Sequence, residues 1–579
     1  MRLLRNRGYR VGGKARPPVA AFVRKESAVW AAHPLLAVLL LVALFAAGGT
    51  AVWPQNTGRS SESPLMRQLR QALSLDQHGD RQGAMALTLQ LLSQNPKFAP
   101  AIKLKGMLLE EAGRTSEAEA AYEEALKFAP SDPDLLFKTG VHQLTAGDRA
   151  QAIKLLEHCT KVLPGDGEAQ YYLAQAYHLN GQDKLALAAI RQSLKAEPDN
   201  PPVWQKYGEL LCSTGDCEAG LRWLLKAHRS DASLPMIDYD IAWTDFKLMD
   251  VAGAAPYAAR AVETRPKDVN ALQLLAAVDV KLARWQEAQT AFERILALEA
   301  EDVEALLGLG HCQLELKNYQ TAVETLQSVL RLDPTRLLAH FYLSRAYASL
   351  GRTADAEHEA ALHQFMMERL TFARTEENDE SEGPIRNQAY QLLTEHREDD
   401  ALQLYRQRFK GTPATDADAY VFVGKLYLMG GDQEDGLRCL HHALKIQPTV
   451  RGAHTYEGIL ALKHGDLSGA ENEFKAELAN DPNSQMAIAE MGEVRYHQQR
   501  WPEAAEQLAK SKTATPELLY MLSDSYFHIG KVEDANLTAE AAAAYGRNKP
   551  ELMKQLSELL VRNGQIELAQ RLSANQGQK

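Results

Sequence analysis

Small and apolar side chains recur along most of this chain at a constant interval of 34 residues. Within residues 99–132, Ile102 and Gly106 fall on one helical stripe, and Ala118 and Tyr122 fall on a second. A glycine separates the two stripes and a proline follows the second, which is typical of two helices joined by a turn. The pattern therefore predicts a helical hairpin that is repeated along the chain.

Two positions of this unit carry small residues in eight consecutive copies. The eighth position holds Gly106, Gly140, Ala174, Gly208, Ala242, Ala276, Gly310 and Ser344. The twentieth position holds Ala118, Ala152, Ala186, Gly220, Ala254, Ala288, Ala322 and Ala356. Because closely crossing helices leave no room for a large side chain, we expect these two positions to meet within each hairpin.

This period and its glycine-punctuated pair of helices resemble the tetratricopeptide repeat family, in particular its membrane-anchored bacterial members. The resemblance implies an all-α fold, a superhelical solenoid of about fourteen antiparallel helix pairs. We expect a first solenoid of nine repeats at 65–370, an acidic linker at 371–383, and a second solenoid with C-terminal capping helices at 384–579.

The N-terminal region differs in composition from the repeats. We predict a basic, disordered cytoplasmic tip at 1–27, a transmembrane helix at 28–53, and a polar spacer at 54–64. The 19 residues from Leu35 to Trp53 carry no charge, a length that just spans a bilayer core of about 30 Å. A cleaved signal peptide is the main alternative, and a buried globular helix fits the uncharged length less well.

Charge is distributed unevenly between the two ends of the molecule. Residues 1–26 contain eight Lys or Arg and one Glu, which sum to +7. Because the net charge of the whole chain is −11, the remaining residues carry −18. Positive charge stays on the cytoplasmic side, so we expect a single-pass inner-membrane protein with periplasmic or extracytoplasmic repeats. A cytoplasmic array in the reversed orientation is the alternative. The acidic body argues against nucleic-acid binding.

In the family that the chain resembles, the first helix of each pair lines a concave groove that binds peptides. The offsets that face this groove give the following candidates: Phe137, Tyr171, Gln175, His178, Tyr239, Trp243, Phe246, Phe341 and Arg345. Trp243 and its neighbours form the strongest signal, since large aromatics suit an anchor pocket. Burial of these side chains against the next repeat is the competing interpretation. No Asn accompanies Lys103 in the pattern that grips a C-terminal carboxylate, so the ligand type stays open.

For two further pairs of residues, the expected chemical state depends on their environment. Cys212 and Cys217 flank one turn and are a candidate disulfide if the array is exported, with two buried thiols as the alternative. Asp245 and Asp279 occupy the eleventh position, where a large apolar residue is usual. We expect these two carboxylates at a partly exposed edge, whereas full burial would raise their pKa values.

No arrangement of residues favours catalysis. His358 and His363 are five residues apart, so they do not share a helical face as zinc-protease histidines do, and the adjacent His441 and His442 point apart. Phosphate-loop, nucleophile-elbow and dinucleotide motifs are missing from the sequence.

We therefore expect a scaffold for protein or peptide partners, possessing no enzyme activity, cofactor or metal, with envelope assembly or export as its setting. The alternative is an accessory or carbohydrate-handling module of an envelope polysaccharide system.

Overall fold

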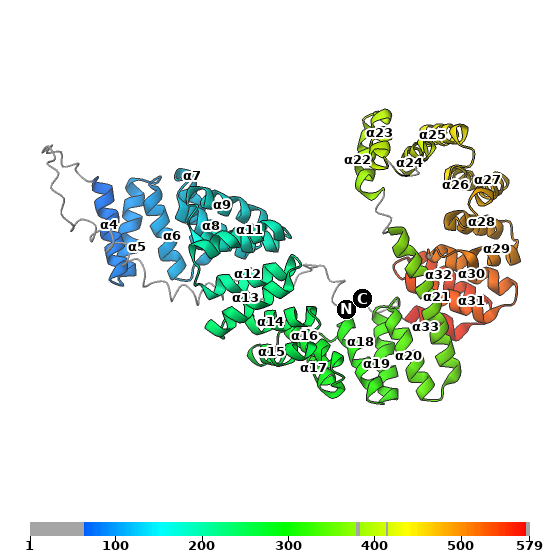
Figure 1. Cartoon of the computed structure of the whole chain (residues 1–579), viewed down its shortest axis with the longest axis horizontal. Helices are drawn as coiled ribbons and strands as arrows, with labels where there is room; N and C mark the ends of the chain where they lie inside the picture. Colours follow the sequence, from blue (N-terminus) through cyan, green and yellow to red (C-terminus); the bar gives the residue numbers. More distant parts are fainter. Residues whose placement is uncertain (1–62, 378–381, 411, 413–414, 514, 575–579) are drawn as a thin grey trace. The chain divides into compact units, whose positions relative to one another are not determined.

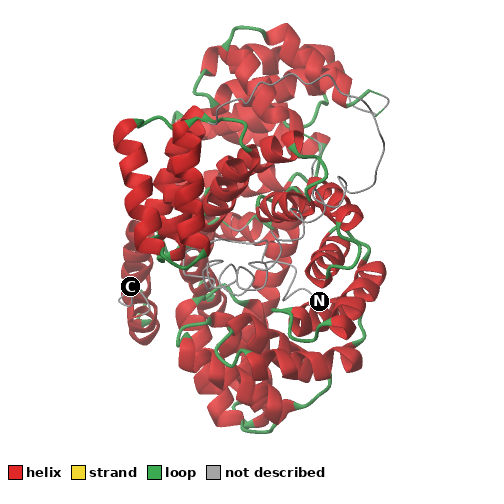
Figure 2. Ribbon diagram, turned by 90° about the vertical axis from the view of Figure 1, so that its left-hand side faces the viewer, coloured by secondary structure: helices red, strands yellow, loops and turns green. Residues whose placement is uncertain are grey.

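The computed structural model describes residues 63–377, 382–410, 412, 415–513 and 515–574. Thirty helices occupy these ranges, and Figure 2 shows only helices and loops among them. Each helix pairs with its successor in a hairpin, so the described residues contain fifteen hairpins. The chain forms two compact units, Met1–Pro266 and Lys267–Lys579. They are referred to as unit 1 and unit 2.

The part of unit 1 that the structure describes contains six hairpins, α4 to α15 (Figure 1). Its first helices are α4 (Pro64–Gln77), α6 (Ala99–Glu111), α8 (Pro133–Ala146), α10 (Gly167–Leu179), α12 (Pro201–Ser213) and α14 (Ile237–Lys247). Its second helices are α5 (Arg81–Gln94), α7 (Thr115–Phe128), α9 (Arg149–Val162), α11 (Asp183–Ala196), α13 (Cys217–Ser230) and α15 (Val251–Thr264).

Unit 2 contains nine hairpins in its described residues, α16 to α33 (Figure 1). Its first helices are α16 (Val269–Lys281), α18 (Val303–Glu315), α20 (Leu337–Ser349), α22 (Gly383–Thr394), α24 (Asp416–Met429), α26 (Ala453–Lys463), α28 (Gln485–His497), α30 (Pro516–His528) and α32 (Pro550–Arg562). Its second helices are α17 (Trp285–Leu298), α19 (Tyr319–Leu332), α21 (Thr353–Glu377), α23 (Glu398–Arg408), α25 (Gln433–Ile446), α27 (Leu467–Asn480), α29 (Trp501–Lys510), α31 (Val532–Tyr545) and α33 (Ile566–Ala574).

The turn inside each hairpin requires a left-handed residue. Gly113 takes this conformation with a φ of 74°, where the absence of a Cβ removes the strain. Five of the described hairpins lack glycine at this position, and the same left-handed φ is adopted there by Met249, Ala283, Lys317, His396 and Gln499. The turn geometry is therefore kept by hairpin packing even where the side chain disfavours it.

The small residues at positions eight and twenty meet as the period predicts. A Cβ added to Gly220 would lie 2.6 Å from the carbonyl oxygen of Gly208, closer than carbon and oxygen tolerate. Ala118 and Ala322 are fully buried at the same crossing in other hairpins. The recurrence of small residues thus reflects close backbone contact within each pair.

Helix α21 is longer than the other helices and includes residues 371–377 of the expected acidic linker. Its apolar residues Leu362 and Met366 share a core with residues of α30 to α33, so the third hairpin of unit 2 packs against the C-terminal hairpins. Arg369 also donates a hydrogen bond of 3.2 Å to the carbonyl oxygen of Ser511. In Figure 1 the green α21 accordingly lies beside the orange and red C-terminal helices.

Asp245 and Asp279 are buried rather than placed at an exposed edge, which corrects the first expectation for these two residues. Position eleven is also buried where it holds Leu109, Leu211 or Tyr347. Burial, reinforced by Asp250, raises the pKa of Asp245 to about 6. Burial also raises the pKa of Asp279 to about 6, although Arg284 partly opposes the shift.

The expected tip, transmembrane helix and most of the spacer lie in residues 1–62, outside the described residues. Among the helices that the structure does describe, none combines the length and the apolar character needed to cross a bilayer.

Candidate partner-binding surface

The candidate residues of unit 1 lie on three first helices, α8, α10 and α14. Six of them keep part of their surface exposed: Phe137, Tyr171, Gln175, His178, Tyr239 and Trp243. Phe246 does not, because it is only 9% exposed. Leu144 and Cys212 occupy the same repeat position and are also buried, whereas His178 at this position stays partly exposed.

Aromatic contacts connect the first two of these helices. Phe137 of α8 packs edge-on against Tyr172 of α10, with ring centroids 5.4 Å apart. Tyr171 contacts the same ring at 5.4 Å from the neighbouring position. On α14, the ammonium of Lys247 lies 5.9 Å from the ring of Trp243. These partly exposed rings offer flat apolar area that costs little entropy to fix in a complex.

A cluster of charged side chains lies between α10 and α12. Nδ1 of His178 is 2.7 Å from Asp183, and its Nε2 is 3.1 Å from Glu209. Lys206 donates a hydrogen bond to Glu209 from one turn earlier in α12. The bond to Glu209 raises the pKa of His178 against the effect of burial. Burial alone would raise the pKa of Glu209, but Lys206 and His178 together lower it.

Asp240 extends the cluster to α14. Its Oδ2 accepts a hydrogen bond of 2.7 Å from Nε2 of Gln205, which also donates to the carbonyl oxygen of Pro235. Burial and the nearby charge of Glu209 raise the pKa of Asp240, and Gln205, Lys206 and Arg265 only partly oppose the shift. Asp240 is therefore a carboxylate whose negative charge is incompletely balanced.

We call this surface the first-helix face of unit 1. It comprises Phe137, Tyr171, Gln175, His178, Gln205, Lys206, Glu209, Tyr239, Asp240 and Trp243. Four polar members were missed by sequence reasoning. Gln205 and Glu209 lie at the same offsets as Tyr171 and Trp243, so a search for polar as well as aromatic residues would have found them. Lys206 and Asp240 lie at the sixth position, for which the period carried no signal.

Phe341 and Arg345 belong to α20 of unit 2 and are both exposed. Phe341 is 40% exposed and borders an open depression with His363 and Met367. Arg345 is paired with Glu315 at 3.1 Å. These residues therefore make a separate, shallower surface from the first-helix face.

Cys212 and Cys217 form a disulfide across the turn between α12 and α13. The other three cysteines, Cys159, Cys312 and Cys439, are free and buried. The disulfide closes the turn at the C-terminal end of α12, the helix that carries Lys206 and Glu209.

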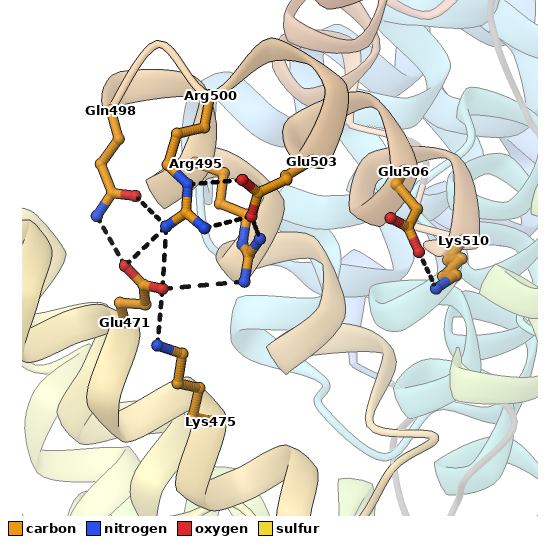
Figure 3. A network of polar contacts seen from close by, with 8 residues as sticks. All are labelled: Glu471, Lys475, Arg495, Gln498, Arg500, Glu503, Glu506 and Lys510. Atoms are coloured by element: carbon orange, nitrogen blue, oxygen red, sulfur yellow. Dashed lines mark hydrogen bonds and ion pairs between the residues drawn. The ribbon is translucent and has the colours of Figure 1, made fainter.

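Unit 2 holds a second polar network, which joins α27, α28 and α29 (Figure 3). Glu471 accepts hydrogen bonds from Gln498 at 2.9 Å and Arg500 at 3.2 Å. Lys475 approaches the same carboxylate to 2.8 Å and is the main reason that its pKa falls to about 2. Arg495 and Arg500 also bind Glu503. In Figure 3 these side chains converge on one another, which is the arrangement of a structural clasp between hairpins.

Models of the tetratricopeptide repeat match five segments of the chain, which are residues 69–133, 143–210, 274–336, 321–362 and 457–518. These segments lie in both compact units and follow the observed hairpins.

Curated relatives share the repeats over part of their length. Cellulose synthase 2 operon protein C of Komagataeibacter xylinus is 27% identical over 242 residues, which cover 41% of this chain and 18% of that protein. The peroxisomal targeting signal receptor of Kluyveromyces lactis is 26% identical over 237 residues, covering 39% of this chain and 40% of the receptor. Protein FlbA of Caulobacter vibrioides is 23% identical, with 39% of each chain covered. The chain thus spans well under half the length of these relatives.

Two solved structures show similar helical repeats. Pseudomonas aeruginosa PilF is 19% identical, covers 36% of this chain and 96% of its own, and gives a TM-score of 0.33. A tetratricopeptide repeat protein from Parabacteroides merdae is 14% identical, covers 43% of this chain and 98% of its own, and gives a TM-score of 0.34.

Proposed function

We propose that this chain, which belongs to the tetratricopeptide repeat family, is a non-catalytic scaffold that holds a protein or peptide partner on the first-helix face of unit 1. One observation carries the proposal: partly exposed aromatic rings and an incompletely balanced carboxylate lie together on successive first helices. Rigid aromatic anchors beside fixed polar groups are the composition of binding hot spots.

The charges of this face indicate the chemistry of the partner. Asp240 and Glu209 repel each other, and Lys206 and His178 are already engaged with Glu209. A lysine or arginine side chain from the partner would balance Asp240 and could rest against the ring of Trp243. We therefore infer a partner segment that presents a basic residue next to an apolar one.

Selection of a displayed peptide library on the full chain in detergent tests this inference. We expect enriched peptides that combine basic and apolar residues. Trp243→Ala should weaken their binding by about tenfold or more, since a central aromatic anchor is lost. Trp223→Ala is the matched control, because it removes an indole of unit 1 from a second helix, α13. Equal loss in both variants, or none in either, would contradict the assignment of the face.

The alternative function, handling of a carbohydrate chain, draws support from the match to a cellulose synthase operon protein. In that case the rings of Tyr239 and Trp243 would stack on sugar rings. Titration with cello-oligosaccharides separates the two functions. Saturable binding that is lost in Trp243→Ala would favour the carbohydrate role over the peptide role.

We further propose that residues 28–53 anchor the chain in the inner membrane and place the repeats on the extracytoplasmic side. The uncharged run and the basic N-terminal flank support this proposal. Alkaline phosphatase fused after Lys579 should be active, and green fluorescent protein at the same site should be dark if export is by the general secretory route. A fluorescent C-terminal fusion would reverse the topology, and a mature N-terminus near Ala51 would replace the anchor by a signal peptide.

A further inference from the structure

Four side chains of unit 2 with metal-binding groups approach one another outside the first-helix face. His454 and Glu457 lie three residues apart on α26, so both project from the same side of that helix. Glu473 of α27 reaches them, with Oε2 at 2.8 Å from Nδ1 of His454. The ligand atoms of these three residues all lie within 4.8 Å of one another. His441 of α25 adds its Nε2 at 3.5 Å from Glu457.

Glu457 is the member that the protein itself leaves unsatisfied. Its side chain is 12% exposed, and its buried Oε1, which lies 3.5 Å from Nε2 of His441, accepts no hydrogen bond from the described residues. Leaving a buried carboxylate oxygen without a donor costs free energy. Glu457 faces Glu473, a second carboxylate, so it also experiences repulsion. A divalent cation between the side chains would remove both penalties.

Another repeat of unit 2 contains the same histidine and glutamate pair without the other two side chains. His340 of α20 and Glu359 of α21 occupy the same repeat positions as His454 and Glu473, and their atoms are 2.6 Å apart. The place of Glu457 is taken there by the buried Leu343, and that of His441 by Gln327. The histidine–glutamate pair by itself is therefore an interhelical hydrogen bond. Glu457 and His441 are what distinguish the second repeat.

We propose that His454, Glu457 and Glu473, with His441 as fourth ligand, bind a zinc ion that clips α25, α26 and α27 together. Two imidazole nitrogens and two carboxylates form a mixed nitrogen and oxygen donor set that suits this borderline cation. Ligands at about 2.0–2.2 Å from zinc in a tetrahedron lie roughly 3.3 Å apart, so small side-chain movements suffice to admit the ion. No sequence motif indicates this site, because its ligands come from three helices.

Zinc binding by the full chain, purified in detergent without a histidine tag, tests the proposal. Competition with a chromophoric chelator should show about one tight equivalent in the native chain. Glu457→Gln preserves the side-chain shape and should weaken this equivalent by about 100-fold or remove it. His340→Gln is the matched control and should leave it unchanged. Equal zinc affinity and stoichiometry in the native chain and Glu457→Gln would overturn the site.

A second measurement on the native chain does not depend on the folding of any variant. Zinc should slow hydrogen exchange in peptides from α25, α26 and α27 and leave those from α20 and α21 unchanged. Cobalt bound in its place should show the intense visible absorption of a tetrahedral centre. Zinc that slows exchange nowhere in α25 to α27 would also overturn the proposal.

Discussion

The surroundings of Glu471 and of Asp240 shift the pKa of a shielded carboxyl group in opposite directions. Glu471 is surrounded by Lys475, Arg495 and Arg500, so its pKa falls to about 2. Burial and the like charge of Glu209 raise the pKa of Asp240, and the hydrogen bond from Gln205 opposes this shift only in part. Ionisation of Glu471 therefore stabilises the folded protein, whereas ionisation of Asp240 destabilises it.

This difference separates a structural surface from a surface that is available to a partner. Around Glu471 the cations and carboxylates of three helices satisfy one another, and a ligand would have to break existing pairs to bind. Around Asp240 the folded chain leaves negative charge partly unbalanced beside exposed aromatic rings. A partner can balance that charge without displacing a native contact, which favours binding at this second region.

Removing Glu471 should produce the largest change in stability. Glu471→Ala removes one of the two carboxylates that Arg495 and Arg500 share and leaves only Glu503 to balance both cations. Glu471 is only 12% exposed. We expect a loss of about 2–3 kcal/mol, because stripping one partner from a shielded ion network leaves uncompensated charge. The midpoint of urea unfolding measures the loss, and faster hydrogen exchange in α27 to α29 localises it.

Glu506→Ala is the control for this variant. Glu506 pairs with Lys510 in the same part of the molecule (Figure 3), but both side chains are exposed. Solvent screens such a pair, so the unfolding midpoint should not move measurably. If both variants lose the same stability, the clasp around Glu471 has no special structural role.

Neutralising Asp240 should have a smaller effect of the opposite sign. A carboxyl group whose folded pKa is raised contributes stability below its unfolded pKa of about 3.9, and this is lost as pH rises through the folded pKa. Asp240→Asn should therefore stabilise unit 1 at pH 8 by about 1–2 kcal/mol and leave it unchanged at pH 4. Its amide oxygen can still accept the hydrogen bond from Gln205.

Urea unfolding of Asp240→Asn at the two pH values measures this difference. Asp199→Asn, at an exposed loop position of the same unit, is the control and should match the native chain at both pH values. The same Asp240→Asn variant should bind a basic peptide more weakly than the native chain does. Destabilisation at pH 8 would show that the charge of Asp240 is balanced in the folded protein.

The sequence predicted the hairpins well because each one is stabilised by contacts that repeat. Gly208 and Gly220 must be small wherever two helices cross, and so their positions recur and can be read from the period. The polar members of the first-helix face and the His454 cluster do not recur. Each includes a contact with a neighbouring hairpin, as when Glu209 of α12 meets His178 of α10. Periodicity carries no information about such singular contacts.

The 34-residue period also predicts where most helices begin, but it does not predict the helices that depart from it. Helices α8 and α16 begin at positions spaced by multiples of 34 residues, whereas α14 begins late, at Ile237, after Met236 adopts a left-handed φ of 69°. The packing of α21 against the C-terminal helices was also beyond the period, because it joins residues far apart in the sequence.

The smallest expected change in stability distinguishes Asp245 from Asp279, which occupy the same buried repeat position in unit 1 and unit 2. Each has a folded pKa of about 6, so stability should fall as pH rises from about 4 to 6 in both places. Asp279 has Arg284 at 3.7 Å, whereas Asp245 faces the like charge of Asp250. Asp245→Asn should therefore stabilise by about 1 kcal/mol at pH 7, and Asp279→Asn by less, since it also gives up an ion pair. Urea unfolding at pH 4 and pH 7 checks both variants. A larger gain from Asp279→Asn would mean that Arg284 contributes nothing to holding that carboxylate, and local burial alone would then set the stability cost of position eleven.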